Sequence, residues 1–289
     1  MASSANTSVN HPYIPSTDSE RAEMLEVIGV DSLDGLLGDI PIEHRHPKLD
    51  IDAGLSEQEL STVFGSIAAE NASSSSGYIS FLGAGSYSHY IPSTVRSILQ
   101  RGEFVTAYTP YQPEAAQGTL QVGFEFQTII CQLTGMEVAN AGMYDGPTAF
   151  AEACLMAARV TKRTKIGVLS TADRRLPDTL LAYSKYQGIE IVEISTDATE
   201  IPDDLACIGI QSPNFFGEIE DIERLTNLAH ENGALSVVHV NPTALGMFKA
   251  PGEFDVDIVT AEGQPLGVPM AFGGPYVGLF ACKKAHIRQ

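Results

Sequence analysis

The chain has 289 residues, of which 44% are hydrophobic and 18% are charged, as in ordinary soluble globular proteins. This length suffices for one large domain or for two small ones. The formal net charge of −19 gives an acidic surface that repels the phosphates of nucleic acid and of anionic membranes. We therefore expect neither of them as a partner.

The cysteines and the N-terminal sequence indicate the cellular compartment. The four cysteines lie far apart, at positions 131, 154, 207 and 282, and this spacing gives neither a zinc site nor a disulfide scaffold. The N-terminus, MASSANTSVNHPY, lacks the basic end and the apolar segment of a secretory signal. The charge-free run 263–282 contains five glycines and three prolines, which a membrane helix would not. These features predict a cytoplasmic protein.

Two capping boxes predict the first helices, which follow a polar N-terminal arm. Thr17 and Glu20 stand three positions apart before RAEMLEVIG, and Gly29 ends that helix. Ser56 and Glu59 repeat the pattern before ELSTVFGSIAAENA, whose apolar residues fall on one helical face. The N-terminal part is therefore predicted to be helical.

The rest of the chain changes from helices to an alternating pattern. A short helix is predicted in PSTVRSILQRG, a long one from about 115 to Thr134 with Gly135 as its end, and another in PTAFAEACLMAARV. Amphipathic helices near 177–187 and 221–231 then alternate with the apolar runs KIGVLS, IEIVEIS, CIGIQS, LSVVHV, VDIVTA and YVGLFAC. This alternation predicts βαβ units around a mostly parallel, buried sheet, and hence the α/β class.

Several common site motifs are missing from the sequence. Gly83 and Gly85 begin a dinucleotide-binding pattern, but Ser88 stands where its third glycine belongs. The sequence has no phosphate-binding GxxxxGK[ST] loop and no GxSxG nucleophile turn. His44 and His46 have no third ligand nearby, so no metal site is predicted.

Two turn-rich segments gather aromatic and polar side chains. GAGSYSHYIP spans 83–92 and AYTPYQPE spans 107–114. Their candidate functional residues are Tyr87, His89, Tyr90, Tyr108, Tyr111, Gln112 and Glu114. Stiff loops that are rich in tyrosine and histidine usually line a site or an interface. The alternative is that these rings only cover the hydrophobic edge of the sheet.

Three long segments resemble glycine decarboxylase, the pyridoxal-phosphate-dependent P protein of the glycine cleavage system. They are SFLGAGSYSHYIPSTVRSIL, FVTAYTPYQPEAAQGTLQVGFEFQTIICQLTGMEVANAGMYDGPTAFAEA and EGQPLGVPMAFGGPYVGLFACK. The N-terminal stretch YIPSTDSERAEMLEVIGVDSLDGLLGDIP is similar to the start of subunit 1 of the two-subunit bacterial form. The resemblance thus covers nearly the whole chain.

The resemblance implies a fold, an activity and partners. The family fold is of the aspartate-aminotransferase type, with a seven-stranded doubly wound sheet in a large domain and a smaller C-terminal domain. Family members decarboxylate glycine and pass its aminomethyl group to the lipoyl-lysine of the H protein. In the two-subunit form, subunit 2 carries the cofactor lysine and subunit 1 is a cofactor-free copy. We expect an N-terminal arm with helices over 1–75 and a large domain over 76–289, truncated before the small domain.

Two residues bear on whether this chain itself holds pyridoxal phosphate. In the turn after VDIVTA, where the resemblance implies the Schiff-base lysine, the sequence has Gln264. A Schiff base needs a primary amine, which glutamine does not have. The carboxylate that keeps the pyridine nitrogen protonated is expected after SVVHV, where the sequence has the neutral Asn241. Lys283 and Lys284 lie past the next strand and are expected at the surface.

The sequence therefore predicts a glycine dehydrogenase (aminomethyl-transferring) subunit that is active only as a heteromer. It would bind no cofactor and no metal, and would contribute its tyrosines and a histidine to a site shared with subunit 2. Two alternatives stay open. One is an independent pyridoxal-phosphate transaminase or lyase with another lysine, and the other is a non-catalytic scaffold that binds subunit 2 or the H protein.

Overall fold

The computed structural model describes residues 13, 15–47, 50–73, 76–106 and 108–288. The chain divides into two units, Met1–Asn71 and Ala72–Gln289, which we describe separately. No helix in the described part of the chain is long and apolar enough to cross a membrane.

The N-terminal unit is helical. Its elements are α1 (Asp18–Ile28), the 3₁₀ turns Leu33–Leu37 and Ile42–His44, and α2 (Glu57–Ala69). Both predicted capping boxes are confirmed, because the side chains of Thr17 and Ser56 accept hydrogen bonds from the backbone N–H three residues on. Gly29 ends α1 with a positive φ of 84°, a conformation in which a side chain is strained. Local sequence therefore decides where these helices begin and end.

The helices of the C-terminal unit follow the predicted segments, except for the short helix α4, which was not predicted. They are α3 (Ser93–Leu99), α4 (Gly102–Val105), α5 (Gln117–Thr134), α6 (Gly146–Thr161), α7 (Arg175–Ser184) and α8 (Ile222–Glu231). The long helix α5 ends at Gly135 as expected. Asp145 caps α6 by accepting a 2.7 Å hydrogen bond from the backbone N–H of Thr148, at the end of the turn GMYDG.

One sheet of seven strands forms the centre of this unit. The strands are β1 (Val138–Ala139), β2 (Lys165–Leu169), β3 (Glu190–Ile194), β4 (Leu205–Gln211), β5 (Leu235–Val240), β6 (Ile258–Glu262) and β7 (Gly278–Cys282). Their order is β1-β7-β6-β5-β4-β2-β3. Strand β7 runs antiparallel to both of its neighbours, and the other pairings are parallel. The mostly parallel sheet is thus confirmed.

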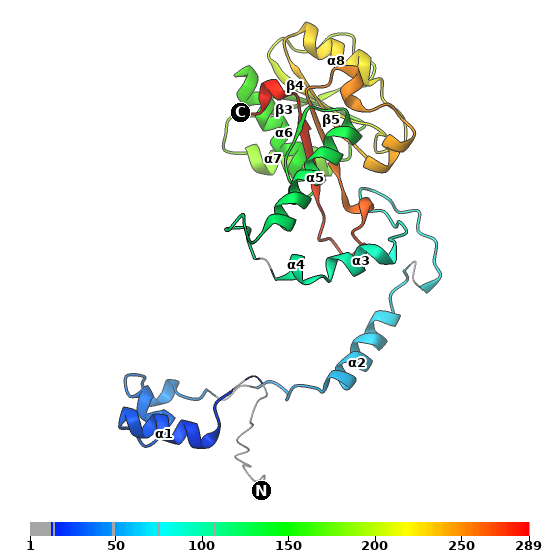
Figure 1. Cartoon of the computed structure of the whole chain (residues 1–289). Helices are drawn as coiled ribbons and strands as arrows, with labels where there is room; N and C mark the ends of the chain where they lie inside the picture. The colour runs from blue at the N-terminus through cyan, green and yellow to red at the C-terminus, as the bar shows by residue number, and fades with distance from the viewer. Residues whose placement is uncertain (1–12, 14, 48–49, 74–75, 107, 289) are drawn as a thin grey trace. The chain divides into compact units, whose positions relative to one another are not determined.

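Helices cover both faces of the sheet (Figure 1). One apolar cluster packs α5 and α8 against the sheet, through side chains such as Ile130 and Leu225. A second cluster packs α6 and α7 against it, through Phe150 and Leu180 among others. Because the central strands are buried on both faces, they are mostly apolar rather than alternating, whereas the edge strand β3 has exposed Glu190 and Glu193.

Helix α6 lies close to the middle strands because small residues let it approach. Four alanines and Cys154 on this helix have no exposed surface. A Cβ on Gly209 of β4 would lie 2.5 Å from the ring of Phe150, and one on Gly278 would lie 2.3 Å from the carbonyl oxygen of Asp145. The glycine on β7 therefore allows the first turn of α6 to sit over the sheet edge.

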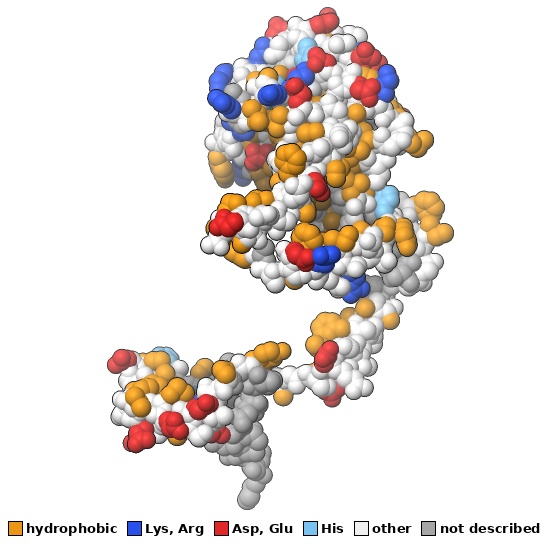
Figure 2. All heavy atoms as spheres, in the orientation of Figure 1, with side chains coloured by type: hydrophobic (Ala, Val, Ile, Leu, Met, Phe, Trp, Pro, Cys, Tyr) orange, Lys and Arg blue, Asp and Glu red, His pale blue; other side chains and the backbone are white. Residues whose placement is uncertain are grey.

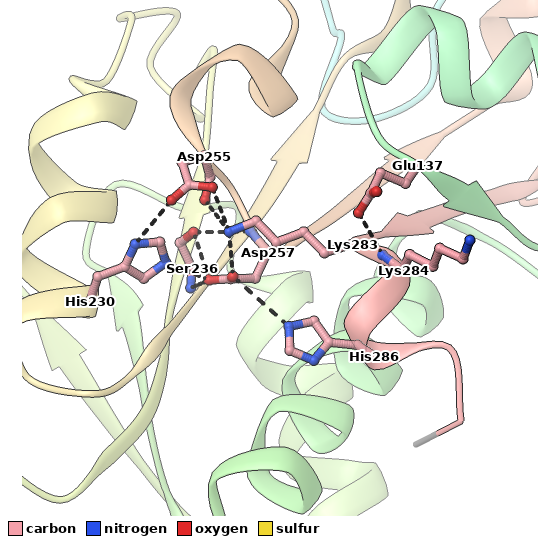
Figure 3. Close-up of polar contacts among 8 residues, drawn as sticks. All are labelled: Glu137, His230, Ser236, Asp255, Asp257, Lys283, Lys284 and His286. Atoms are coloured by element: carbon pink, nitrogen blue, oxygen red, sulfur yellow. Dashed lines mark hydrogen bonds and ion pairs between the residues drawn. The ribbon is translucent and has the colours of Figure 1, made fainter.

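A polar cluster occupies the end of the sheet where β5 and β6 begin (Figure 3). The buried carboxylate of Asp257 accepts from the amine of Lys283 at 2.8 Å and from the backbone N–H of Ser236 at 2.9 Å. The imidazole of His230 lies 2.7 Å from the same carboxylate, and Lys283 also pairs with Asp255. The side chain of Lys283 is 26% exposed, so it lies at the surface as expected, and its amine is in addition held by two aspartates.

Large apolar side chains stay exposed on the part of this unit that precedes β1. On α5 they include Phe124 and Ile129, and on the loop before α3 they include Phe81 and Leu82. Figure 2 shows such side chains gathered around α3, α4 and α5. The same helix α5 buries its opposite side against the sheet, so it is apolar on more than one face.

Candidate functional site

A cavity of about 590 Å³ lies at the carboxyl ends of the parallel strands. Its walls include the end of β4 at Gln211, the end of β5 at Asn241, and the end of β6 at Glu262. The loop from Leu82 to Tyr87 and the start of α6 complete the walls. Ligands of open α/β sheets bind in this position, because the loops and helix N-termini at the carboxyl ends face it.

The carboxylate of Glu262 lies in this wall with backbone N–H groups around it. It accepts from the N–H of Gly146 at 2.8 Å, of Gln264 at 2.9 Å and of Val277 at 3.1 Å. Burial raises the pKa of Glu262, the three hydrogen bonds lower it, and the net result is a pKa above the ordinary value. Gly146 is the first residue of α6, so the carboxylate also meets the positive end of the helix dipole.

Gln264 is buried beside Glu262 and uses its whole side-chain amide. Its oxygen accepts from the N–H of Tyr87 at 3.0 Å, and its nitrogen donates to the carbonyl oxygens of Tyr87 at 3.0 Å and Val268 at 2.7 Å. Only 1% of the residue is exposed. The side chain therefore fastens the loop that carries Tyr87 to the connection between β6 and β7.

A second attachment fastens the same loop to the start of α7. The guanidinium of Arg175 donates to both oxygens of Asp173 at 3.1 Å and to the carbonyl oxygen of Ala84. The hydroxyls of Ser86 and Tyr276 are hydrogen-bonded to each other. The loop wall is thus held at three points that are distant in sequence.

His239 on β5 is the buried imidazole of the cavity wall. Its Nδ1 lies 3.0 Å from the hydroxyl of Thr260, and the ring meets Phe150 edge to face with centroids 6.1 Å apart. Burial lowers the pKa of His239 to about 4. The imidazole is therefore neutral at neutral pH, so it can hold a hydrogen bond but does not offer a positive charge to an anion.

Asn241 follows β5 and lines the cavity, half-buried. Its side-chain oxygen accepts from the backbone N–H of Thr243 at 3.0 Å and from the hydroxyl of Thr243 at 2.7 Å. It caps a 3₁₀ turn that spans Pro242–Gly246. The neutral amide thus serves the local turn at the position where the sequence suggested a missing carboxylate.

Comparison with known proteins assigns the chain to a family. The family model described as glycine cleavage system P-protein matches residues 11–289. The chain belongs to this family. Among its P-protein relatives, the probable glycine dehydrogenase (decarboxylating) subunit 1 of Geobacillus thermodenitrificans is 47% identical over 289 residues, and that of Desulforamulus reducens is 48% identical over 287. Each alignment covers 96% of this chain and 64% of the relative, so the chain spans less than two thirds of the relatives' length.

Solved structures confirm the predicted fold class. A crystal structure of glycine decarboxylase (P-protein) of the glycine cleavage system, in inhibitor-bound form, matches with a TM-score of 0.86 and 40% identity, covering 96% of this chain and 64% of that one. A sphingosine-1-phosphate lyase from Burkholderia pseudomallei matches with a TM-score of 0.58 at 13% identity, over 86% of this chain and 64% of that one. The second likeness concerns the fold alone. The aspartate-aminotransferase-like fold is therefore that of a P-protein.

Of the seven predicted aromatic and polar residues, the structure brings Tyr87 to the cavity wall. Tyr90, Tyr108 and Tyr111 are 90%, 94% and 78% exposed, and they point to a surface rather than into this cavity. The remaining three, His89, Gln112 and Glu114, are also exposed. These residues stay a prediction for a site that this unit does not complete by itself.

The sequence reasoning missed the polar residues that do line the cavity. They are Asp173, Arg175, His239 and Glu262. His239 and Glu262 each stand two positions before a residue that was singled out, Asn241 and Gln264. Since parallel strands carry their functional residues at their carboxyl ends, the last residues of the predicted strands were the available signal.

The side chains of the cavity do not fit pyridoxal phosphate, the cofactor that the family resemblance implies. Among the described residues that line the cavity, none is a lysine. Gln264 has no amine that could form a Schiff base, and Asn241 cannot supply a negative charge to a pyridine nitrogen. The N-terminus of α6, where a phosphate would be stabilised, already holds the carboxylate of Glu262.

Proposed function

We propose that this chain is the cofactor-free subunit of a heteromeric glycine decarboxylase. With a second subunit that carries pyridoxal phosphate, it would release carbon dioxide from glycine and pass the aminomethyl group to the lipoyl group of the H protein. The observation that carries the proposal is Gln264, which is buried and fully hydrogen-bonded beside Glu262 of the cavity wall in a P-protein family member. The four cysteines of the chain are free, as is usual in the reducing cytoplasm, so we propose the cytoplasm as its location.

An independent pyridoxal-phosphate transaminase or lyase is the weaker candidate. Such an enzyme needs a lysine in reach of the cofactor, and the described cavity wall supplies an amide and a carboxylate instead. Lys283, at the opposite end of β6, is engaged by Asp255 and Asp257. Borohydride reduction of the purified chain with pyridoxal phosphate, followed by peptide mapping, should yield no pyridoxyl-lysine.

The exposed aromatic and apolar residues support association with a partner. Tyr90 precedes α3 in the chain, Tyr108 and Tyr111 lie between α4 and α5, and all three are largely exposed. Exposed apolar side chains gather around the same helices (Figure 2). Large exposed apolar patches usually mark interfaces. We propose that subunit 2 covers this surface and that the loops 86–90 and 108–114 reach the partner's cofactor, which distinguishes this chain from a scaffold without a catalytic role.

The test is glycine decarboxylation by mixed subunits, measured as carbon dioxide released in the presence of lipoyl H protein. His89→Ala and Tyr111→Phe should each lower the rate by about 10²–10⁴-fold, the usual cost of one positioned proton-transferring group. Sedimentation should show that both variants still associate with subunit 2. Tyr186→Phe is the matched control, since Tyr186 is 90% exposed at the end of α7 and should keep the full rate. Full activity of the His89 and Tyr111 variants would favour the scaffold instead.

A further inference from the structure

The start of α6 has the physical properties of an anion-binding site. The helix is 16 residues long, and its first N–H groups point toward the cavity end of the sheet. Unpaired N–H groups and the helix dipole together stabilise a negative charge at such a terminus. Here the N–H of Thr148 is already used by the cap Asp145, and the N–H of Gly146 donates to Glu262 at 2.8 Å.

The donors around Glu262 come from three separate segments. Gly146 begins α6, Gln264 lies in the β6–β7 connection, and Val277 immediately precedes β7. None of the ion pairs in the described part of the chain involves Glu262. The carboxylate is thus bound by converging backbone N–H groups alone, which is the donor arrangement that proteins offer to phosphate.

Packing around the first residue of α6 is tight. A Cβ on Gly146 would lie 2.9 Å from the Cβ of Glu262 and 2.9 Å from the imidazole of His239. Glu262 is 7% exposed, so its side chain fills the space at the helix end. The neutral imidazole of His239 closes the other side.

We propose that Glu262 is the built-in ligand of an anion site formed by the N–H groups of Gly146, Gln264 and Val277, and that it excludes phosphate and phosphorylated small molecules from these N–H groups. The tethered carboxylate competes with free anions at a high effective concentration, because it is attached to the adjoining strand. The exclusion would be independent of the missing lysine. It concerns the folded chain by itself and does not require the proposed function in glycine cleavage.

The decisive experiment removes the carboxylate and offers a free anion in its place. Thermal melting of the Glu262→Ala chain is followed in increasing potassium phosphate, with potassium chloride at equal ionic strength as the reference. The midpoint should rise with the logarithm of the phosphate concentration above the dissociation constant, by about 3–5 °C at tenfold that constant. The wild-type chain should melt alike in both salts.

Two further variants separate the site from general effects of the substitution. Glu262→Gln leaves the space filled and should give no phosphate response. Glu220→Ala removes another half-buried carboxylate, which accepts from Thr171 and Asn214 away from α6, and should also give none. With ¹⁵N-glycine labelling, the Gly146 signal of Glu262→Ala should shift as phosphate is added.

Two outcomes would overturn the proposal. One is a folded Glu262→Ala chain that is indifferent to phosphate, and the other is a wild-type chain that responds as strongly as the variant. If Glu262→Ala does not fold in chloride, its refolding yield from urea is measured in phosphate and in acetate. Recovery in either anion supports the site, and no recovery in both rejects it.

Discussion

Strand β6 has a buried carboxylate at each end, and the two are stabilised in different ways. Asp257 immediately precedes the strand and is bound by the amine of Lys283, with the imidazole of His230 alongside. Glu262 ends the strand and is bound by backbone N–H groups. One end of the sheet therefore neutralises its carboxylate with side-chain charge, and the other relies on dipoles.

The pKa values of the two carboxyl groups differ accordingly. At Asp257 burial raises the pKa, but hydrogen bonds from Lys283, Ser236 and His230 outweigh it and leave the pKa below the ordinary value. At Glu262 the effect of burial is larger than that of the three N–H hydrogen bonds, so the pKa stays above the ordinary value. Because a full cation close by favours the ionised form more than backbone dipoles do, the end that carries Asp257 acts as a stabilising network.

The largest effect is expected from Asp257→Asn. The substitution leaves Lys283 without its buried partner, and breaking a buried ion pair costs about 3–5 kcal/mol of unfolding free energy. Urea denaturation at pH 7 measures the loss. Asp255→Asn is the control, because the side chain of Asp255 is 74% exposed and an exposed pair contributes at most about 1 kcal/mol. Equal costs for the two variants would contradict the assigned role of burial.

The next largest effect is expected in the pH dependence of stability, from His239 in the cavity wall. Its pKa is about 4 in the folded chain, against about 6.5 when unfolded. Between these values the unfolded chain binds the extra proton, so stability is present above pH 6.5 and falls by roughly 3 kcal/mol as the pH drops to 4. His239→Gln should lack this part of the decline in urea denaturation. The exposed His44 has no such burial, so His44→Gln should follow the wild-type curve.

Gln264→Leu should cost about 2 kcal/mol, because it leaves the N–H and carbonyl of Tyr87 and the carbonyl of Val268 without their partner. The bonds are between neutral groups, so this cost should not change with salt. Gln187→Leu is the control, since its amide makes one exposed hydrogen bond and should change stability by less than about 0.5 kcal/mol. A salt-dependent cost at Gln264 would show that charge also matters there.

The smallest effect concerns the opposite pH dependence of the two carboxylates. For Asp257 the folded pKa is lowered, so the advantage of wild type over Asp257→Asn should shrink as the pH falls below about 3.9. For Glu262 the pKa in the folded chain is raised. The free energy of unfolding of the wild type should therefore increase relative to that of Glu262→Gln as the pH falls toward about 4.3. Denaturation series for both variants give the two slopes. If the difference in unfolding free energy between wild type and variant changed with pH in the same direction for both residues, the contrast between the two ends of β6 would be contradicted.

Most helix limits and the alternation of helices and strands along the chain could be predicted from the sequence because their causes are local. The capping boxes at Thr17 and Ser56 and the glycine that ends α5 involve residues within one turn of each other. Apolar runs between amphipathic helices required a sheet that is buried on both faces, and the structure has it. Family membership was likewise predictable, since the matching segments extend along nearly the whole sequence.

The candidate site was less predictable, because its contacts join distant parts of the chain. Glu262 meets Gly146 across 116 positions, and Gln264 meets Tyr87 across 177. The pattern around 262–264 indicates the end of a strand, but it does not indicate which helix terminus lies opposite. The ion pair of Lys283 with Asp257 was not predictable for the same reason, since the distance between them depends on the antiparallel direction of β7.

The sequence by itself determined the α/β class and most helix boundaries, and it led to the prediction that Gln264 stands in place of a lysine. These follow from propensities, caps and the chemistry of single side chains. Only the tertiary structure decided that Gln264 holds the Tyr87 loop, and that Glu262 fills the end of α6. The reason is physical: a buried polar group must find partners, and the packing of strands and helices determines which backbone groups are within 3 Å.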